Sequence, residues 1–213
     1  MRHPSACSTS RPSSPPGGRT IPIPGSPPAA ASAPGRRQPL AALRRDFPVL
    51  PRPGYHPVDT FTPRGAFADL LAEIEAGALD RAMSAQFGLD FIALPRLVTV
   101  RQVSAAHEGR PHTDSASKVA TLLLYMHSGW ASPEGRIRVL RRESLADPVA
   151  EVSPEAGNIF AFLRGEHSWH GHTPFVGERR VVQVAWLRDA AALERKRRRG
   201  LLAWRLKGLF GRH

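Results

Sequence analysis

A run of short apolar segments between Leu97 and Leu187 constrains the fold most strongly. Each segment is rich in β-branched, aliphatic or aromatic residues and is bounded by Gly, Pro, Ser or Asp, which is typical of strands joined by turns. The segments read LVTVRQV, VATLLLYM, RIRVLR, NIFAFL, HSWHG and RRVVQVAWL. Because no helical pattern separates them, they predict a mainly β fold, an antiparallel sandwich or barrel such as a jelly roll.

A helix is predicted immediately before these strands. Thr62 is a candidate N-cap with Pro63 at the first helical position, and apolar residues then recur at helical spacing as far as Phe87. Gly88 is the expected terminator. The strand-rich region is therefore expected to carry a flanking helix.

The two ends of the chain differ from its middle. Residues 1–45 are dense in Pro, Ser, Gly and Ala and predict a disordered tail, because few large apolar groups are present to offset the entropy of ordering. We expect one folded domain over 46–190, with a jelly-roll core at about 97–188. Residues 191–213 combine a basic run with apolar residues. They predict either an amphipathic helix at a membrane surface or a terminal helix packed on the domain.

The net charge of +12 is concentrated at these ends. Residues 1–45 hold seven arginines and no acid, and residues 191–213 hold eight basic residues against one acid, so each end carries +7; the remaining part carries 15 basic and 17 acidic residues, or −2. Sequence-specific binding of nucleic acid is therefore not expected of the folded part. Peripheral contact with a membrane or a polyanion through the basic C-terminal segment stays open.

The cysteine content and the hydropathy pattern bear on the location of the protein. The single cysteine, Cys7, allows neither a disulfide framework nor a thiolate metal site. No apolar run reaches the roughly 18 residues of a membrane span, and the N-terminus lacks the apolar region of a secretory signal. A cytoplasmic protein is the resulting expectation.

The stretch GRPHTD contains the first candidate site residues. His112 and Asp114 flank one residue, so in an extended segment both side chains project from the same face. Such a pair alone is more often solvated or locally hydrogen-bonded. Downstream, however, His170 precedes a predicted strand that carries Arg179. Two histidines and one carboxylate form the facial triad of non-haem Fe(II) oxygenases, and an arginine suits the binding of a carboxylate.

From about Leu97 to Leu187 the sequence resembles the Fe(II)/2-oxoglutarate-dependent dioxygenases, specifically the prolyl-4-hydroxylase-like branch. The resemblance covers less than half of the chain. The matching features are His112 and Asp114 as the H-x-D pair, His170 with Pro174 four residues later and Arg179 nine later, Tyr125 with Trp130 five later, and the segment SPEAGNIFAF. One departure is EGRIRVL, where relatives often have two glycines and this chain has Arg136 at the second.

The resemblance implies a double-stranded β-helix, the jelly-roll or cupin-like barrel, and assigns roles to its matching residues. His112, Asp114 and His170 would be the catalytic Fe(II) ligands. Arg179 would bind the distal carboxylate of 2-oxoglutarate, and Tyr125 would support it. The implied reaction hydroxylates a C–H bond of a peptidyl residue, an amino acid or a small metabolite, with O₂ consumed and 2-oxoglutarate converted to succinate. Ascorbate is the expected reductant.

Two neighbouring residues compete for the assigned roles. His170 and His172 share a face of an extended segment, but only His170 has the offsets to both Pro174 and Arg179. Arg180 adjoins Arg179 and is expected to point the other way. His167 lies on the opposite face and is expected to be a surface or a packing residue.

Two alternative functions remain open on the sequence alone. A cupin-like barrel without catalytic activity would bind a metal or a sugar and ignore 2-oxoglutarate. An adaptor would act through its basic tails at a membrane or a polyanion, with the barrel as a scaffold.

Overall fold

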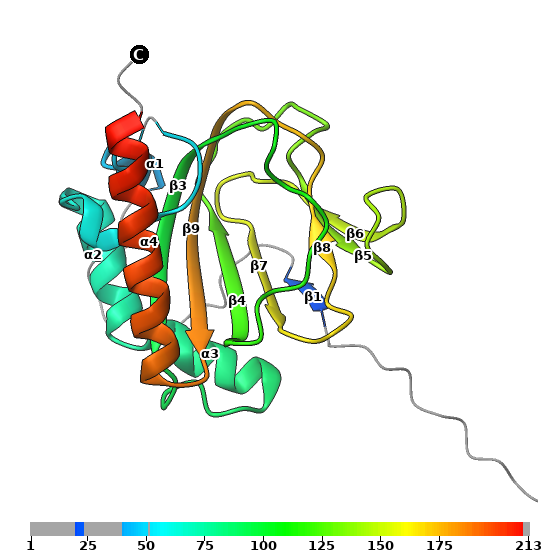
Figure 1. Ribbon diagram of the computed structural model, residues 1–213, viewed down its shortest axis with the longest axis horizontal. Helices are drawn as coiled ribbons and strands as arrows, with labels where there is room; N and C mark the ends of the chain where they lie inside the picture. The colour runs from blue at the N-terminus through cyan, green and yellow to red at the C-terminus, as the bar shows by residue number, and fades with distance from the viewer. Residues whose placement is uncertain (1–19, 24–39, 51, 211–213) are drawn as a thin grey trace, which may run out of the picture.

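The computed structural model describes residues 20–23, 40–50 and 52–210, and for 20–23 and 204–210 it describes the backbone only. Its centre consists of two antiparallel sheets (Figure 1). The larger has the order β1-β7-β4-β9-β3-β2 and the smaller β6-β5-β8. The strands are β1 (Thr20–Ile23), β2 (His56–Pro57), β3 (Arg96–Ser104), β4 (Lys118–Tyr125), β5 (Ile137–Leu140), β6 (Pro148–Val152), β7 (Ile159–Leu163), β8 (His170–Gly171) and β9 (Gly177–Leu187).

Alternation along the strands divides the larger sheet into two apolar faces. One face of β4, β7 and β9 packs toward the smaller sheet through a core that includes Leu123, Phe160 and Val181 together with Ile137 of β5. In the described part of the chain, no strand of the larger sheet pairs with a strand of the smaller sheet. The arrangement is the predicted jelly-roll, or double-stranded β-helix, architecture, so the expected fold class is confirmed.

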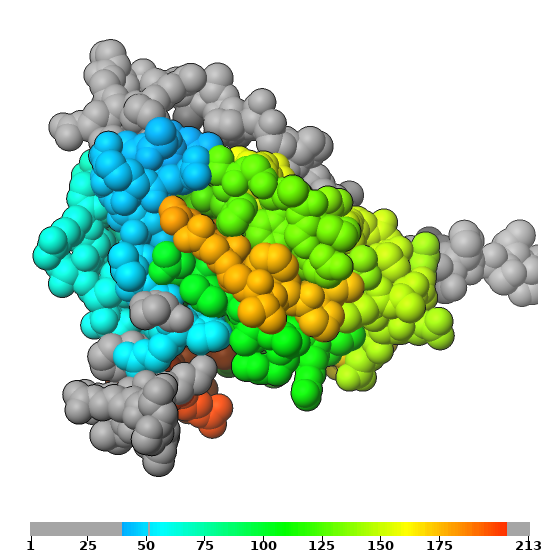
Figure 2. Space-filling model, turned by 90° about the horizontal axis from the view of Figure 1, so that it is seen from above, coloured from blue at the N-terminus to red at the C-terminus, as the bar shows by residue number. Residues whose placement is uncertain are grey.

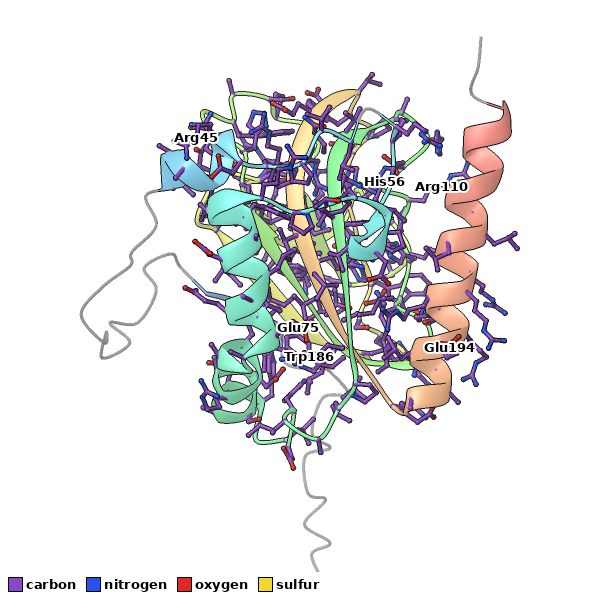
Figure 3. The ribbon with its side chains drawn as sticks, turned by 90° about the vertical axis from the view of Figure 1, so that its left-hand side faces the viewer. Arg45, His56, Glu75, Arg110, Trp186 and Glu194 are labelled. Carbon is purple, nitrogen blue, oxygen red and sulfur yellow. The ribbon has the colours of Figure 1, made fainter. Side chains whose placement is uncertain are left out.

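Helices cover the rest of the larger sheet: α1 (Leu40–Arg45), the short 3-10 helix η1 (Val58–Thr60), α2 (Gly65–Glu75), α3 (Ala78–Phe87) and α4 (Ala190–Phe210). Helices α2 and α3 pack on the outer face, against Val184 and Trp186 of β9. The alternate residues Ala185 and Leu187 face Ala192 of α4. Figure 3 shows α2 and α4 on opposite sides of the larger sheet.

The helix predicted between Thr62 and Phe87 is two helices, and Thr62 is not its N-cap. Helix α2 begins at Gly65, and the backbone N–H of Ala66 donates to the carboxylate of the distant Asp46 at 2.9 Å. The helical conformation is interrupted at Gly77, whose φ of 83° belongs to the left-handed region that favours glycine. The expected terminator Gly88 does end α3, with a φ of 70°.

Three further features differ from the sequence expectations or fall outside the described residues. Strand β6 was not predicted, because PVAEV contains Pro and Glu and is largely exposed. Residues 40–45, expected in the disordered tail, form α1 and contact α2. The remainder of that tail, apart from β1, lies outside the described residues.

The basic C-terminal segment forms a helix. Within the described residues α4 contacts β2, β3 and β9, and the Arg197 guanidinium pairs with Asp59 of η1 at 2.7 Å. A search of these residues found no helix both long and apolar enough to cross a membrane.

The buried carboxylate of Asp80 joins α3 to the sheet. It accepts hydrogen bonds from the Arg96 guanidinium at 2.5 Å and from the Trp186 indole N–H at 2.7 Å. Arg96 also donates to the backbone oxygens of Ile74 and Glu75 at 2.7 and 3.0 Å, which satisfies the C-terminal end of α2 (Figure 3 labels Glu75 and Trp186). One buried ion pair therefore connects α2, α3, β3 and β9.

Replacing Asp80 by Ala should lower the free energy of unfolding by about 3 kcal/mol, because Arg96 and Trp186 lose their buried acceptor. Urea denaturation followed by tryptophan fluorescence measures the change. Glu73→Ala, which removes an exposed carboxylate from α2, is the matched control and should change the unfolding free energy by less than about 0.5 kcal/mol. Equal effects of the two substitutions would contradict the role given to Asp80.

Candidate active site

A cavity of about 320 Å³ lies between the two sheets. Its walls come from β3, β4, β7 and β9 of the larger sheet, β5 and β8 of the smaller sheet, and the loop between β3 and β4. Every site residue expected from the sequence except Tyr125 lines it, namely His112, Asp114, His170 and Arg179. Tyr125 is fully buried directly behind Arg179.

Backbone pairing brings the two histidines together. His112 and His170 form an isolated antiparallel bridge, in which the N–H of His112 donates to the oxygen of His170 at 2.9 Å and the reverse bond measures 3.0 Å. Their rings lie 4.3 Å apart, centroid to centroid. Asp114 follows two residues later, and one potential ligand atom from each of the three residues lies within 4.8 Å of the others.

Backbone carbonyl groups orient both imidazoles. The Nδ1 atom of His112 lies 2.9 Å from the oxygen of Arg110, and Nδ1 of His170 lies 2.9 Å from the oxygen of Ser168. A carbonyl only accepts hydrogen bonds, so each Nδ1 carries a proton, which leaves Nε2 as the nitrogen of each ring that could bind a metal. Burial, with His112 nearby, lowers the pKa of His170 to about 4, so this imidazole is neutral at physiological pH. Both rings therefore suit a metal ion.

Asp114 is buried but remains a carboxylate. Lys118 Nζ lies 2.7 Å from Oδ1, and the Thr121 hydroxyl donates to Oδ2 at 2.5 Å. Burial by itself raises the pKa of Asp114, but the charge and hydrogen bond of Lys118 and the hydroxyl of Thr121 outweigh it and hold the pKa below its ordinary value. Two imidazoles and one carboxylate are the donor set of a facial Fe(II) site, so these residues fit that metal.

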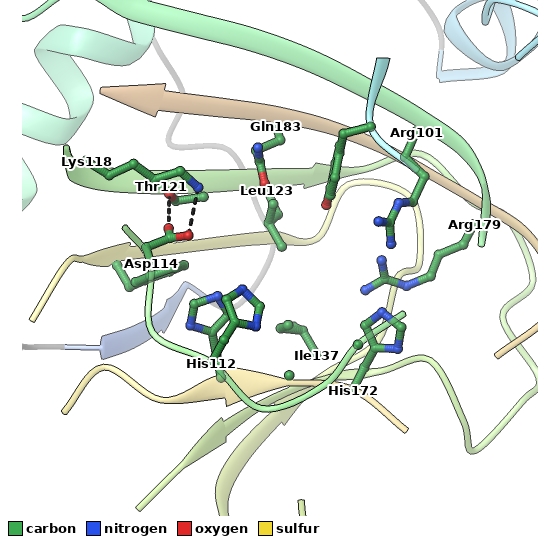
Figure 4. A pocket seen from close by; sticks show the side chains of 15 residues that line it. Arg101, His112, Asp114, Lys118, Thr121, Leu123, Ile137, His172, Arg179 and Gln183 are labelled. Atoms are coloured by element: carbon green, nitrogen blue, oxygen red, sulfur yellow. Dashed lines mark hydrogen bonds and ion pairs between the residues drawn. The ribbon is translucent and has the colours of Figure 1, made fainter. Parts of the chain in front are cut away.

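The other candidate histidines lie elsewhere. His172 is buried in the same cavity, but its Nδ1 lies 2.9 Å from the oxygen of Thr173 and it is outside the three-residue cluster. Figure 4 places it beside Arg179, away from Asp114. His167 is exposed. The three-residue cluster therefore contains His170 and not His172.

Arg179 is held at the opposite end of the cavity. It is almost fully buried; its Nε donates to the oxygen of Gly135 at 2.8 Å and Nη2 to the Tyr125 hydroxyl at 3.4 Å. Burial raises the pKa of Tyr125 above its ordinary value, so this phenol keeps its proton. Arg180 points the other way, as expected, and donates to the oxygen of Arg44.

The turn with the unusual Arg136 supports Arg179 through its glycine. Gly135 has a φ of 72°, and a Cβ there would lie 2.9 Å from the Trp130 ring and 3.0 Å from Phe175. Arg136 turns away from the cavity, donating to the oxygen of Ser132 at 3.1 Å. Figure 2 shows the segment leading into β9, in orange, between the loops that follow β3 and β4, in green. The departure from the family pattern therefore leaves the support of Arg179 in place.

Several residues of the cavity were not assigned from the sequence. Thr121 and Leu123 share the inward face of β4 with Tyr125, and Gln183 shares that of β9 with Arg179. Strand alternation alone would have identified these three. Tyr55 gave no such signal, because it precedes β2 in a proline-rich lead-in.

Comparison with known proteins gives a family-model match over the region that carries this site. Residues 98–188 match the model of the 2OG-Fe(II) oxygenase superfamily. A search of curated proteins gave no match.

Among solved structures, a prolyl-4-hydroxylase from Pseudomonas putida is 25% identical over 61% of this chain and 70% of that chain, with a TM-score of 0.45. A prolyl 4-hydroxylase from Phytophthora capsici is 20% identical over 61% of this chain and 49% of its own, with a TM-score of 0.42. A viral collagen prolyl hydroxylase from Paramecium Bursaria Chlorella virus-1 is 14% identical over 59% and 75%, with a TM-score of 0.41.

Replacing His112, Asp114 or His170 by Ala should weaken binding of Co(II), a spectroscopic probe for such sites, by more than the roughly 10–100-fold expected for loss of an outer partner. The visible absorption of Co(II) titrated into the protein measures this. His172→Ala and the exposed His167→Ala are the controls and should bind Co(II) as the wild type does. Loss of binding in His172→Ala, with binding intact in His170→Ala, would contradict the assignment.

Proposed function

We propose that this chain, whose residues 98–188 belong to the 2OG-Fe(II) oxygenase superfamily, hydroxylates a C–H bond and converts 2-oxoglutarate to succinate. The observation that carries the proposal is the placement of the His112–Asp114–His170 cluster and Arg179 at opposite ends of one cavity. The family implies Fe(II) and 2-oxoglutarate, and the enzyme is accordingly a 2-oxoglutarate-dependent dioxygenase.

His112, Asp114 and His170 would hold the iron through two Nε2 atoms and one carboxylate oxygen. Bound Fe(II) would supply open coordination positions for the co-substrate and O₂, and the oxidising capacity for the hydroxylation. The protein fixes the tautomers of both histidines and keeps Asp114 ionised inside a largely buried site.

Arg179 would bind the distal carboxylate of 2-oxoglutarate. Its guanidinium is positioned before any ligand arrives, because the oxygen of Gly135 and the hydroxyl of Tyr125 already restrain it. Neither contact uses the whole planar fork, so hydrogen-bond donors remain for a carboxylate. When the distal carboxylate is bound at this end, the 2-oxo acid group of the co-substrate points toward the metal ligands.

The balanced reaction consumes one 2-oxoglutarate, one O₂ and one substrate C–H bond, and gives succinate, CO₂ and the hydroxylated substrate. One oxygen atom enters succinate and the other enters the product. Asp114 supports hydroxylation over halogenation, because halogenating relatives lack this carboxylate and bind halide at its position. The substrate would be a peptidyl residue, an amino acid or a small metabolite.

Anaerobic visible absorption tests the assembly without knowledge of the substrate. Adding 2-oxoglutarate to the Fe(II)-loaded wild type should produce a charge-transfer band, and His170→Ala should not show it. His167→Ala is the matched control and should retain the band. An iron-loaded, folded wild type without the band would favour the non-catalytic metal-binding barrel.

Replacing Arg179 by Ala should weaken 2-oxoglutarate binding by roughly 10- to 150-fold, the value of one hydrogen bond between charged groups. Titration of the same band gives the dissociation constant. Arg180→Ala removes a neighbouring arginine whose side chain lies outside the cavity, and should leave the affinity within about twofold of wild type. An unchanged affinity in Arg179→Ala would refute the role of Arg179.

A further inference from the structure

A second arginine faces the cavity at the Arg179 end. Arg101 lies on β3, and its residue is 7% exposed, against 1% for Arg179. Both residues line the cavity at the end away from Asp114, and Figure 4 shows their guanidinium groups pointing toward one another. The Arg101 guanidinium stacks on the ring of Tyr55, 4.2 Å from its centroid, which fixes its plane.

The protein satisfies the hydrogen-bonding capacity of Arg101 only in part. Nη2 donates to Glu108 Oε1 at 2.9 Å and Nη1 to the Ser104 hydroxyl at 3.3 Å. In the described part of the chain, buried Nε has no hydrogen-bond partner. A guanidinium carries five N–H groups, and buried donors are as a rule paired. Arg101 therefore retains donors that the protein does not satisfy.

The charges at this end are also unbalanced. Arg101 and Arg179 contribute two positive charges, and among the residues that contact them Glu108 contributes the one negative charge. At the other end Lys118 and Asp114 pair with each other, so neither offsets the arginines. Two buried cations facing one cavity are unfavourable unless an anion joins them. A single carboxylate would balance the charges and accept from the N–H groups that remain on Nη1 and Nη2.

Glu108 restrains the guanidinium of Arg101. Its second oxygen accepts from the backbone N–H of Ala105 at 2.9 Å, so the carboxylate is held by the turn that follows β3. Arg101 is thus restrained on both sides, by Glu108 and by Tyr55, much as Arg179 is restrained by Gly135 and Tyr125. Both arginines are positioned in advance for a planar anion.

We propose that Arg101 and Arg179 together bind the distal carboxylate of 2-oxoglutarate, so that Arg101 is a second residue that selects this co-substrate. The inference rests on the proposed function. It adds a specificity: a 2-oxo acid with a distal carboxylate is preferred over one of equal length that ends in a methyl group, and both arginines contribute to that preference.

The test compares 2-oxoglutarate with 2-oxopentanoate, which has the same five carbons and no distal carboxylate. Dissociation constants are measured anaerobically from the charge-transfer band of the Fe(II)-loaded wild type, Arg101→Met, Arg101→Lys and Arg138→Met. Arg138 lies on β5, pairs with Glu151 outside the cavity, and serves as the matched control.

Arg101→Met should weaken 2-oxoglutarate binding roughly 10- to 100-fold and leave 2-oxopentanoate binding within about twofold. The preference for the dicarboxylate should fall by the same factor. Arg101→Lys keeps the charge but not the planar fork, so its affinity for 2-oxoglutarate should lie between wild type and Arg101→Met. Arg138→Met should match the wild type.

Two outcomes overturn the inference: 2-oxoglutarate affinity within twofold of wild type in both Arg101 variants, or an equal loss for both acids, which would mean that Arg101 only maintains the fold. Either of these leaves the proposed function standing if the wild type binds 2-oxoglutarate. A wild type that binds neither acid would refute the proposed function itself.

Discussion

The antiparallel bridge between His112 and His170 is the constraint on which the site depends. It places two residues 58 positions apart in direct register, and it does so next to two glycines. A Cβ on Gly171 would lie 2.7 Å from the oxygen of Gly109, and one on Gly109 would collide with His172. The backbones can therefore approach closely enough to bring both imidazoles to Asp114 only because neither glycine has a side chain.

The cavity is electrostatically divided. At one end the Asp114 carboxylate is paired with Lys118 and lies beside His112 and His170, and these three residues could hold a metal ion. At the other end Glu108 pairs with Arg101, and among the described residues Arg179 forms no ion pair, which leaves an excess of positive charge. A dianionic 2-oxo acid matches this division, since one carboxylate would meet the metal end and the other the arginine end. The charge distribution therefore favours one orientation of the bound acid as well as one class of ligand.

Strand periodicity and short motifs predicted the fold class, most of the strands and the three clustered residues. These successes share a cause, because alternation and residue offsets are local properties of the sequence. The errors come from contacts between distant segments. The division of the long helix depends on Arg96 and on Gly77, and the start of α2 depends on Asp46, none of which local spacing identifies. The orientation of Arg101 similarly depends on its contacts with Glu108 and Tyr55.

Helix α4 packs against one edge of the larger sheet, at β2 and β3. Strand β3 is nine residues long, yet among the described residues the one strand that pairs with it on the side away from β9 is the two-residue β2. Long strands with unpaired backbone groups are templates for association between copies. Helix α4 contacts both β2 and β3, with Gly200 close against Pro57, and η1 also contacts β3. The basic helix therefore covers part of a β-sheet edge and reduces the backbone that this edge offers to another copy of the chain.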